Sequence, residues 1–482
     1  MQKLWSITGR SMTVSALALA LAACQSMRGP EPVVQANIPS SYSNASGSSI
    51  AEQGYKDFFA DPRLIQVIDL ALENNRDLRT AALNIERAQQ QYQISRNNEL
   101  PTIGASGSVL RQDTIGSSGP TTSYNIGLGL TAYELDFWGR VRSLKDSALD
   151  TYLATQSARD ATQISLISQV TQAWLTYAYA NANLQLAEKT LKSQLDAYNL
   201  NKKRFDVGID NELSVRQAQI SVETARNDVA SYKTQVAQAK NALNLLAGEP
   251  VPDNLLAKNK VSKITNIDAI GTGLPSDLLL NRPDLRSAEF KLSAAGANIG
   301  AARAQLFPTI TLTGTAGYGS TDLSDLFKSG SFIWSVGPSL NLPIFDWGTR
   351  RSNVKIAEID QKIALSDYEK SIQSAFSEVN DALAVRYNIA DRLSAQRRLV
   401  EASKASYRLS SARFNAGIDG YLNVLDAQRS SYAAEQGLLT LEQANLNNQV
   451  ELYKSLGGGV KANSSTTVQK PLSSEQQHRQ NQ

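Results

Sequence analysis

The chain has 482 residues and a net charge of +3, with 48 Lys and Arg against 45 Asp and Glu, so no basic excess indicates a nucleic-acid binder. Apolar residues make up 42%, and no stretch of 18 apolar residues follows the N-terminus, which excludes a helical membrane span in the mature chain. One cysteine and one histidine leave no disulfide and no zinc-type cluster to be built.

Residues 1–23 have the pattern of an export signal peptide. Lys3 and Arg10 supply the charged start, and a short apolar segment follows. The run Leu21-Ala22-Ala23-Cys24 resembles the bacterial lipobox. We therefore expect Cys24 to become the first residue of the mature chain and to carry acyl chains such as palmitate, because several chains anchor a protein far better than one. An ordinary thiol in a cleaved signal is the alternative.

The residue after the cysteine bears on the destination. Gln25 is not the Asp that in enteric bacteria commonly retains lipoproteins in the inner membrane. We therefore expect a lipid-anchored outer-membrane protein that extends into the periplasm. Residues 24–61 are rich in Ser, Pro, Asn and Gly, which predicts an extended tether.

A helix is predicted from Pro62 to Asn98 because its apolar residues recur on one face. Two strand-like runs then lie between Pro101 and Trp138, and two more between Pro308 and Trp347. Their apolar residues alternate with Gly, Ser and Thr over about ten residues, a pattern typical of membrane β-barrel strands. Four strands of a soluble sandwich with one wet face are the alternative.

Four strands cannot close a membrane barrel. About eight is the minimum, and open sheet edges are not tolerated in lipid. The chain must therefore share strands with copies of itself, and these runs do not distinguish two copies from three.

Two very long helices are predicted by the absence of Gly and Pro from Arg140 to Phe205 and from Thr349 to Phe414. Each would be roughly 100 Å long. Both end in the element Arg-Phe-x-x-Gly-Ile-Asp, whose Gly supplies a left-handed backbone at which a second helix can return. We therefore expect two antiparallel hairpins with their Gly-Ile-Asp turns at one end.

The helices are unusually polar for a bundle core. Ala, Gln, Ser and Asn outnumber large aliphatic residues over 212–246, whereas a solid four-helix core needs more Leu and Ile. Thin apolar seams suit helices packed around a water-filled bore. A solvent-exposed coiled-coil stalk is the alternative.

An internal duplication is the firmest organisational feature. Pro101 and Pro308 are 207 residues apart, and Trp138 and Trp347 are 209 apart. A near-constant offset over some 150 residues indicates two copies of one unit. The predicted organisation is a signal peptide (1–23), the tether (24–61), a first repeat (62–249), an equatorial connector forming a small mixed domain (250–275), a second repeat (276–456) and a disordered tail (457–482).

Catalytic chemistry has no support in the sequence. The sole histidine, His478, lies in the tail, and no nucleophile elbow, P-loop or dinucleotide fingerprint occurs in a fitting context. Asp and Glu are abundant, but none forms a recognisable acid/base couple. We expect no enzyme activity, no metal and no cofactor apart from the covalent lipid.

The lipobox, the Leu-Pro-Thr-Ile and Phe-Pro-Thr-Ile strand starts, the duplication and the segments 274–285 and 414–418 together resemble the TolC-like outer-membrane efflux ducts, in their lipidated OprM-like branch. The resemblance covers roughly residues 60–456. It implies an α+β membrane protein in which a homotrimer, with four strands per chain, forms a 12-stranded β-barrel continuous with a periplasmic α-helical barrel.

The resemblance also implies partners and a task. Such ducts work with an inner-membrane RND pump and a periplasmic adaptor protein in tripartite multidrug efflux, and so contribute to antibiotic resistance by exporting drugs, detergents and small solutes. A trimeric adhesin-like surface stalk and a protein-secretion duct of the same fold are the alternatives.

A periplasmic gate is implied in the segment 421–428. Leu422 and Asp426 are four residues apart and share one helix face, so threefold symmetry would make a ring of each. Asp426 matches the acidic ring of the family and Leu422 the apolar constriction of its OprM-like members. Asn423 stands where TolC carries a second Asp, and Gln217 is the equivalent of Asp426 in the first copy. An ordinary surface carboxylate is the alternative for Asp426.

The paired turns Gly208-Ile209 and Gly417-Ile418 would form the tip that the adaptor grips.

Overall fold

The computed structural model describes residues 27–35, 53–113, 119–266 and 281–459, and Cys24 and His478 therefore lie outside the described residues. The chain divides into two compact units. The first comprises residues 1–35, 83–156 and 287–370, and the second comprises 36–82, 157–286 and 371–482. Over the described part, no helix is both long and apolar enough to cross a membrane.

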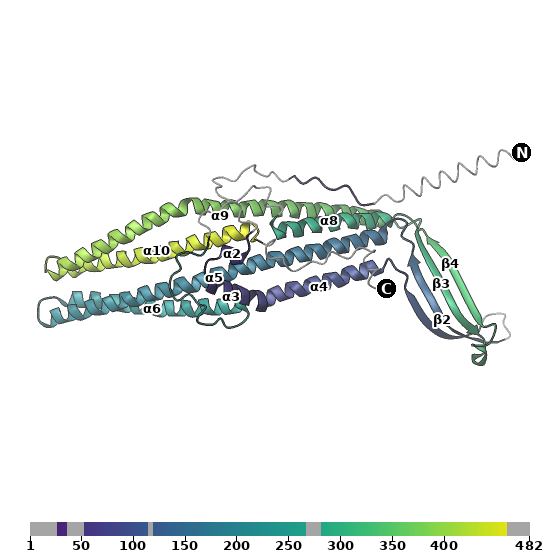
Figure 1. The fold of residues 1–482 in the computed structure, drawn as a ribbon, viewed down its shortest axis with the longest axis horizontal. Coiled ribbons are helices and arrows are strands. Elements are labelled where there is room, and N and C mark those ends of the chain that lie inside the picture. Colours follow the sequence, from purple (N-terminus) through teal and green to yellow (C-terminus); the bar gives the residue numbers. More distant parts are fainter. Residues whose placement is uncertain (1–26, 36–52, 114–118, 267–280, 460–482) are drawn as a thin grey trace. The chain divides into compact units, whose positions relative to one another are not determined.

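The first unit contains one antiparallel sheet of four strands in the order β1-β2-β3-β4 (Figure 1). The strands are β1 (Ile103–Gln112), β2 (Thr121–Glu134), β3 (Thr309–Ser320) and β4 (Phe332–Asn341). They coincide with the four predicted runs, in which a period of two places most apolar residues on one face. Leu110 and Ile333 are exceptions on the other face.

One face of the sheet is apolar across all four strands. Leu128 lies opposite Ala316, and Ala316 lies opposite Trp334, so the apolar residues form continuous cross-strand rows. Leu128, Trp334 and Val336 are nonetheless largely exposed. Strands β1 and β4 end the sheet on either side, and within the described residues neither edge has a further strand beside it.

The junction between sheet and helix is held by an aromatic contact in the first copy. The Trp138 ring stacks on Phe307 at 4.7 Å, and its Nε1–H donates to the carbonyl of Pro308 at 2.8 Å. The equivalent Trp347 is 98% exposed. The same residue type thus packs in one copy and lacks a packing surface in the other.

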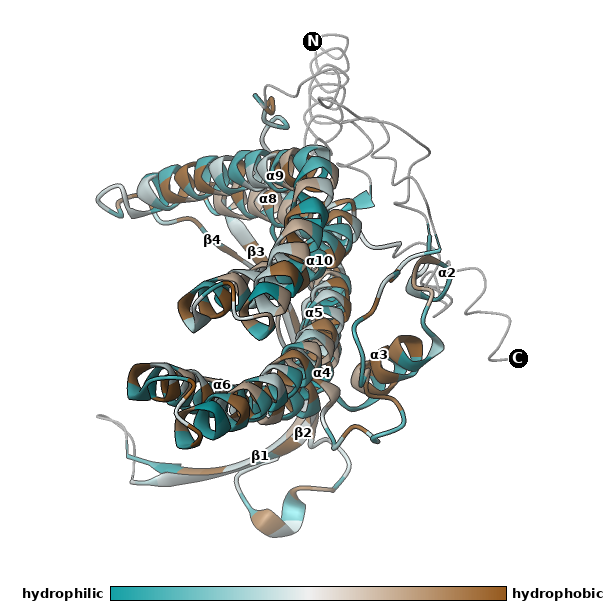
Figure 2. Cartoon of the chain, turned by 90° about the vertical axis from the view of Figure 1, so that its left-hand side faces the viewer, coloured by the Kyte–Doolittle hydropathy of each residue, from teal (hydrophilic) through white to brown (hydrophobic). Residues whose placement is uncertain are grey.

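The second unit consists mainly of two helical hairpins. The first hairpin is α5 (Arg140–Asp206) with α6 (Glu212–Ala247), and the second hairpin is α9 (Thr349–Asn415) with α10 (Tyr421–Ser455) (Figure 1). The long helices begin in the first unit and continue into the second. Hydrophilic and hydrophobic residues are interleaved along these helices (Figure 2).

The predicted helix from Pro62 to Asn98 is wrong as one element, because the structure breaks it into α3 (Pro62–Asn74) and α4 (Arg76–Asn97). Asn75 between them is extended, with φ −63° and ψ 129°. Its Oδ1 accepts from the Leu78 amide at 3.0 Å, and its Nδ2 donates to the Leu246 carbonyl at 2.9 Å. Asparagine competes well with helical backbone bonds, so one side chain both starts α4 and ties it to α6.

The remaining helices of the described part are short or flank the hairpins: α2 (Tyr55–Phe58), α8 (Pro283–Ala304) and the 3-10 turn η1 (Leu323–Asp325). The prediction of an extended tether over 24–61 is wrong at its end, where α2 forms and Phe58 and Phe59 are buried. The connector, predicted as a small mixed domain, has no helix over its described residues 250–266 and only an isolated bridge between Thr265 and Phe59. We call residues 250–266 the strap. The Trp174 and Tyr179 side chains of α5 donate to its Leu255 and Val261 carbonyls, both at 2.9 Å.

The predicted start of the disordered C-terminal tail at Gly457 is wrong. Gly457, Gly458 and Gly459 are buried and all have positive φ. A Cβ on Gly457 would lie 2.7 Å from the Asn281 carbonyl oxygen, and one on Gly458 would lie 2.7 Å from the Ile164 side chain. The three glycines therefore belong to the folded unit, and residues 460–482 lie outside the described part.

Candidate gate and tip of the helical hairpins

Both hairpins turn through the same backbone motif. In the first, the Ile209 amide donates to the Arg204 carbonyl at 2.8 Å and the Gly208 amide donates to Phe205 at 2.9 Å. In the second, Ile418 and Gly417 make the equivalent bonds to Arg413 and Phe414, both at 2.9 Å. This is the Schellman arrangement, which needs a left-handed residue after the helix.

Glycine meets that need at both tips. Gly208 and Gly417 have φ of 77° and 75°, and a Cβ on either would meet nothing within 4 Å. The backbone conformation alone therefore requires glycine there. The apolar residues that follow, Ile209 and Ile418, are 69% and 63% exposed. Each tip presents an isoleucine to the outside of the chain.

The side chains around the two tips differ. Arg413 makes a two-pronged pair with Asp419, with Nε–Oδ2 at 2.6 Å and Nη2–Oδ1 at 3.0 Å. This hydrogen bond to Arg413 lowers the pKa of the Asp419 carboxyl below its ordinary value. Arg204 lies 3.8 Å from Asp210 and places its guanidinium 4.7 Å from the centre of the Phe414 ring. Arg413 therefore pairs within its own turn, whereas Arg204 of the first hairpin also contacts Phe414 of the second.

Beneath the second turn lies a small buried cluster that joins the hairpins. Its residues come from α6, α9 and α10, with Ala197 and Tyr198 of α5 packed against it; its buried members are Ala218, Phe414, Tyr421, Val424 and Leu425. Burial raises the pKa of Tyr421 to about 12, so the phenol is neutral at physiological pH. The cluster fixes which face of α10 points away from the other helices.

The gate residues predicted from the sequence lie on that outward face. Leu422 is 60% exposed, and Asn423 and Asp426 are exposed as well, whereas Val424 and Leu425 between them are buried. Leu422 and Asp426 therefore share one face, one turn apart. The contacts of a single chain leave both side chains free to meet other copies.

Sequence reasoning missed a residue of this surface in the first copy. Leu213 of α6 is the equivalent of Leu422 at the 209-residue offset, and it is 64% exposed. The signal was in the sequence, because the 209-residue offset that relates Asp426 to Gln217 also relates Leu422 to Leu213. The first copy thus repeats the apolar position but has the neutral Gln217 at the acidic one.

Behind the gate face, three small cavities of about 220, 180 and 60 Å³ lie beside Gln428, where α5 and α10 face each other. The Gln428 Nε2 donates to Ser193 Oγ at 3.3 Å. Among the described residues, the buried oxygens Asn201 Oδ1 and Gln194 Oε1, whose residues line two of these cavities, have no hydrogen-bond partner. Two buried acceptors without a protein donor mean that the hairpins are not packed here as a dry apolar core.

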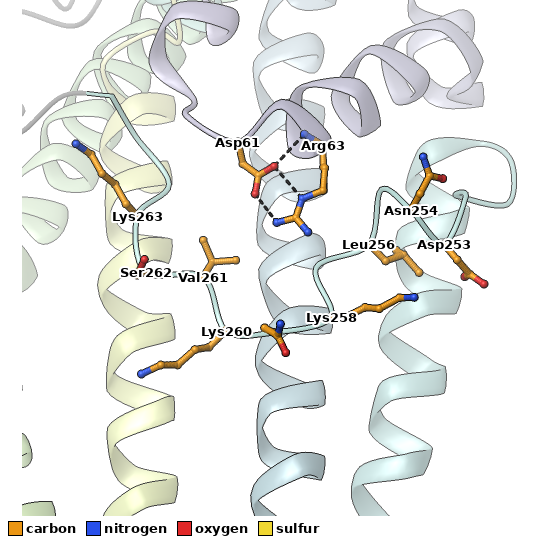
Figure 3. Close-up of a pocket in the computed structure, with 11 residues that line it drawn as sticks. Asp61, Arg63, Asp253, Asn254, Leu256, Lys258, Lys260, Val261, Ser262 and Lys263 are labelled. Atoms are coloured by element: carbon orange, nitrogen blue, oxygen red, sulfur yellow. Dashed lines mark hydrogen bonds and ion pairs between the residues drawn. The ribbon is translucent and has the colours of Figure 1, made fainter.

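The largest groove, about 530 Å³, lies between the strap and the start of α3 (Figure 3). Most of its charges are used within the chain. Asp61 is bonded to Arg63 at 2.7 Å, and outside the groove Lys260 reaches Glu442 at 3.0 Å and Asp253 is paired with Lys240 at 2.8 Å. Figure 3 shows the lysine side chains diverging rather than meeting. These contacts therefore hold the chain around the groove to α3, α6 and α10. The groove does not have the convergent groups of a binding site.

No group of three or more His, Cys, Asp or Glu residues among the described ones could hold a metal ion.

Comparison with known proteins gives the context for this arrangement. The family model described as outer membrane efflux protein matches residues 67–249 and 274–458. The antibiotic efflux pump outer membrane protein ArpC of Pseudomonas putida is 42% identical, over 95% of this chain and 100% of its own length. The solvent efflux pump outer membrane protein SrpC of Pseudomonas putida is 45% identical, over 84% of this chain and 87% of its own.

Solved structures agree with this grouping. A membrane protein from Pseudomonas aeruginosa superposes with a TM-score of 0.87 and 38% identity, covering 92% of this chain and 100% of that one. The open state of the Neisseria gonorrhoeae MtrE outer membrane channel gives a TM-score of 0.84 and 40% identity, covering 91% and 99%. Matches of this extent to the family model and to its members mean that the chain belongs to the outer membrane efflux protein family.

Proposed function

We propose that three copies of this chain form the outer-membrane duct of a tripartite RND-type efflux system, which exports drugs, detergents and other small solutes through a helical tunnel gated at its periplasmic end. One observation carries the proposal. Over the described residues, a sheet with an exposed apolar face and two open edges is joined to long hairpins along which hydrophilic and hydrophobic residues are interleaved. Such a sheet is stable in lipid only when its edges are closed.

The internal duplication specifies how the edges would meet. Ile103 pairs with Leu130 and Ile310 pairs with Leu340, so Leu340 is the structural equivalent of Leu130. Leu130 itself lies opposite Gly314, whose equivalent at the 207-residue offset is Gly107. If β4 meets the next subunit's β1 as β2 meets β3, Leu340 of one subunit lies opposite Gly107 of the next.

The exposed tryptophan supports the same arrangement. Trp138 packs on Phe307 and donates to Pro308 within the chain. The equivalent partners of Trp347 are Leu100 and Pro101, and Leu100 is 65% exposed. In the trimer, Trp347 would cover Leu100 of the next subunit and donate to the Pro101 carbonyl, which gives an otherwise solvent-exposed indole a partner.

Cysteine cross-linking tests closure and register together. Cys24 is the only native cysteine and would be acylated, so introduced thiols are unambiguous. We expect Gly107→Cys combined with Leu340→Cys to give covalent trimers with a short thiol cross-linker. Ile103→Cys with Leu340→Cys, displaced by four residues, is the matched control. Monomers from the first pair, or trimers from the control alone, would refute the proposed register.

The gate proposal rests on the outward face of α10. Rings of Leu422 and Asp426 at successive depths would combine an apolar constriction with three crowded carboxylates, which repel one another and attract cations. Replacing Leu422 with Ser and Asp426 with Ala should raise the closed-state conductance in planar bilayers. Exposed Leu245 near the other end of α6 provides a control, since Leu245→Ser removes an apolar side chain far along the helix from Leu213. A double variant that conducts no better than the parent would exclude the gate.

The remaining assignments follow from the same assembly. The exposed pairs Gly208-Ile209 and Gly417-Ile418 would be the adaptor-docking tip, and Cys24 would carry the lipid that helps to hold the duct in the outer membrane. Deleting the gene and measuring retention of a fluorescent pump substrate tests export directly. Unchanged retention would favour a structural stalk over a duct.

A further inference from the structure

Residues 27–35 of the N-terminal tether belong to the first unit and pack on it mainly through their first three residues. Gly29 is buried, and Met27 and Arg28 are half-buried. Residues 33–35 are exposed, although the Gln35 amide donates to Glu369 Oε1 of α9 at 2.8 Å. Within residues 27–35, the buried contacts therefore lie at the end nearest Cys24.

The Arg28 guanidinium joins two helices at this contact. Its Nη2 donates to the carbonyl and the Oγ of Ser293 on α8, at 2.8 and 2.6 Å. Ser293 Oγ donates to Asp150 Oδ2 of α5 at 2.6 Å, and Arg28 itself lies 3.7 Å from that carboxylate. Charge-assisted bonds that share one carboxylate are directional and hold a side chain in one place.

The backbone of the tether fits because α8 carries two glycines one turn apart. A Cβ on Gly300 would lie 3.2 Å from the Arg28 amide nitrogen and 2.8 Å from Ser143 Oγ. A Cβ on Gly296 would lie 3.4 Å from Arg28 Nε. We call Gly296 and Gly300 the glycine notch. Any larger residue at Gly300 would move the tether away from the helix.

A second arginine supports the notch from the other side. Arg303 Nη1 donates to the Met27 carbonyl at 3.5 Å, and Arg303 is itself paired with Glu358 of α9 at 2.8 Å. Gly29 is buried beside Ile299, and a Cβ on Gly29 would lie 3.6 Å from that side chain, at ordinary van der Waals distance. The polar contacts of Arg28 and Met27 thus hold the segment Met27–Gly29.

We propose that the glycine notch, with Ser293 and Asp150, is an intramolecular docking site for the segment that follows the lipidation cysteine, and that Arg28 is the positioning residue that fixes the lipid anchor relative to the barrel strands. This rests on the proposed acylation of Cys24. Four residues separate Cys24 from Arg28, so the acylated residue lies at most about 14 Å from the docked arginine. Gly300 is four residues from the end of α8, about 6 Å along the helix, and β3 follows shortly after.

The consequence is a lipid anchor that acts as part of the folded duct. A free tether of about 35 residues would let the acyl chains occupy a wide range of positions. A docked tether would hold them beside the strand–helix junction. Ordering the segment costs conformational entropy, which the shared arginine contacts and the buried Gly29 offset. The segment would therefore be held even though residues 33–35 beyond it are exposed.

Spin labelling tests the docking in the intact lipoprotein. Glu31→Cys introduces an exposed thiol three residues after Arg28, in a chain whose only other cysteine would be acylated. We expect an immobilised spectrum in the parent, and a several-fold faster rotation after Arg28→Ala or Gly300→Val. Arg351→Ala, which removes an exposed arginine from α9 of the same unit, should leave the spectrum unchanged.

The outcomes separate the docking from the proposed function. Should Gly300→Val fail to assemble, Gly296→Val and Arg28→Ala still report on the notch. A mobile label in the parent, or equal immobility in Arg28→Ala and the parent, overturns the docking site. Intact mass reports acylation of Cys24 and substrate retention reports export, so failure of either leaves the spin-label result readable.

Discussion

The two copies of the repeat share a backbone but hold their hairpins by different chemistry. At the root of the first hairpin, Asn75 donates to the Leu246 carbonyl at the end of α6. The equivalent residue of the second copy is Arg282, which donates to the Ser455 carbonyl at the end of α10, at 3.1 Å. Arg282 also pairs with Glu378 at 2.7 Å and Asp284 at 2.6 Å. A neutral amide and a buried guanidinium occupy one structural position.

The tips repeat this contrast. Asn211 caps α6 by accepting from the Ser214 amide at 3.0 Å, whereas Gly420 precedes α10 without a side-chain cap. The second tip has the Arg413–Asp419 pair instead. At the gate position the first copy has Gln217 and the second has Asp426. The first tip also has an Arg204–Asp210 pair, but at 3.8 Å against 2.6 Å for Arg413–Asp419. The second hairpin therefore has the closer charge pairs at both its root and its tip, which makes it the more sensitive to pH and salt.

The largest effect is expected at the roots. Arg282→Ala removes charge-assisted bonds to the partly exposed Glu378 and Asp284 and leaves the buried Ser455 carbonyl without this donor, and should cost about 2–4 kcal/mol. Asn75→Ala removes only neutral bonds and should cost about 1–3 kcal/mol. Thermal unfolding of the purified protein in mild detergent compares them. Equal losses would mean that the charge at the second root has no special weight.

Two glycines near those roots should respond alike to alanine substitution. Their equal response would sharpen the contrast between Asn75 and Arg282. A Cβ on Gly248 would lie 2.4 Å from the Asn74 carbonyl oxygen, and one on Gly457 would lie 2.7 Å from that of Asn281. Both have positive φ. Alanine at either should cost about 1–3 kcal/mol through backbone strain alone. Gly104→Ala, which meets nothing within 4 Å, is the control for the same unfolding measurement.

Exchanging the caps should make the tips resemble each other. Asn211→Ala removes the acceptor for Ser214 and should destabilise the start of α6 by about 1 kcal/mol. Gly420→Asn supplies a cap to α10 and should stabilise it by a few tenths of a kcal/mol. Hydrogen exchange of the first-turn amides measures both. Slower exchange in α6 after Asn211→Ala would contradict the assigned cap.

The smallest effect is a pH dependence confined to the second tip. Because the pKa of Asp419 is lowered in the folded chain, the Arg413 pair stabilises the turn above the unfolded carboxyl pKa near 4, and this is lost as pH falls through the lowered value. Amide exchange at Ile418, corrected for its intrinsic pH dependence, should show reduced protection below about pH 4. Arg413→Gln should abolish the change. A pH response that persists in Arg413→Gln must come from another group.

Much of this organisation could be predicted because it is periodic in the chain. Alternation in segments such as 124–132 defines strands, the glycine-free runs define the long helices, and the offset between Trp138 and Trp347 reveals the duplication. The tips followed from Gly208 and Gly417, since a left-handed turn leaves few choices of residue. Leu422 and Asp426 were placed on one face by helix geometry.

Other features have no local signature. The break at Asn75 depends on a carbonyl in α6, 171 residues away. Gly457–Gly459 read as the start of a tail, yet they are buried because Asn281, Ile164 and Gln53 approach them. Arg28 is unremarkable in the tether until α8 brings Ser293 and the glycine notch beside it.

The sequence by itself thus determined the family, the repeat, the four strands, the two hairpins and the residues of their turns, because each is written in residues near one another. Only the tertiary structure decided which equivalent positions carry a charge pair and which a neutral bond, where the first helix breaks, and where the tether docks. The decisive contacts, Asn75–Leu246, Arg282–Ser455 and Arg28–Ser293, join residues 171, 173 and 265 apart, whose approach is set by packing and not by local preference.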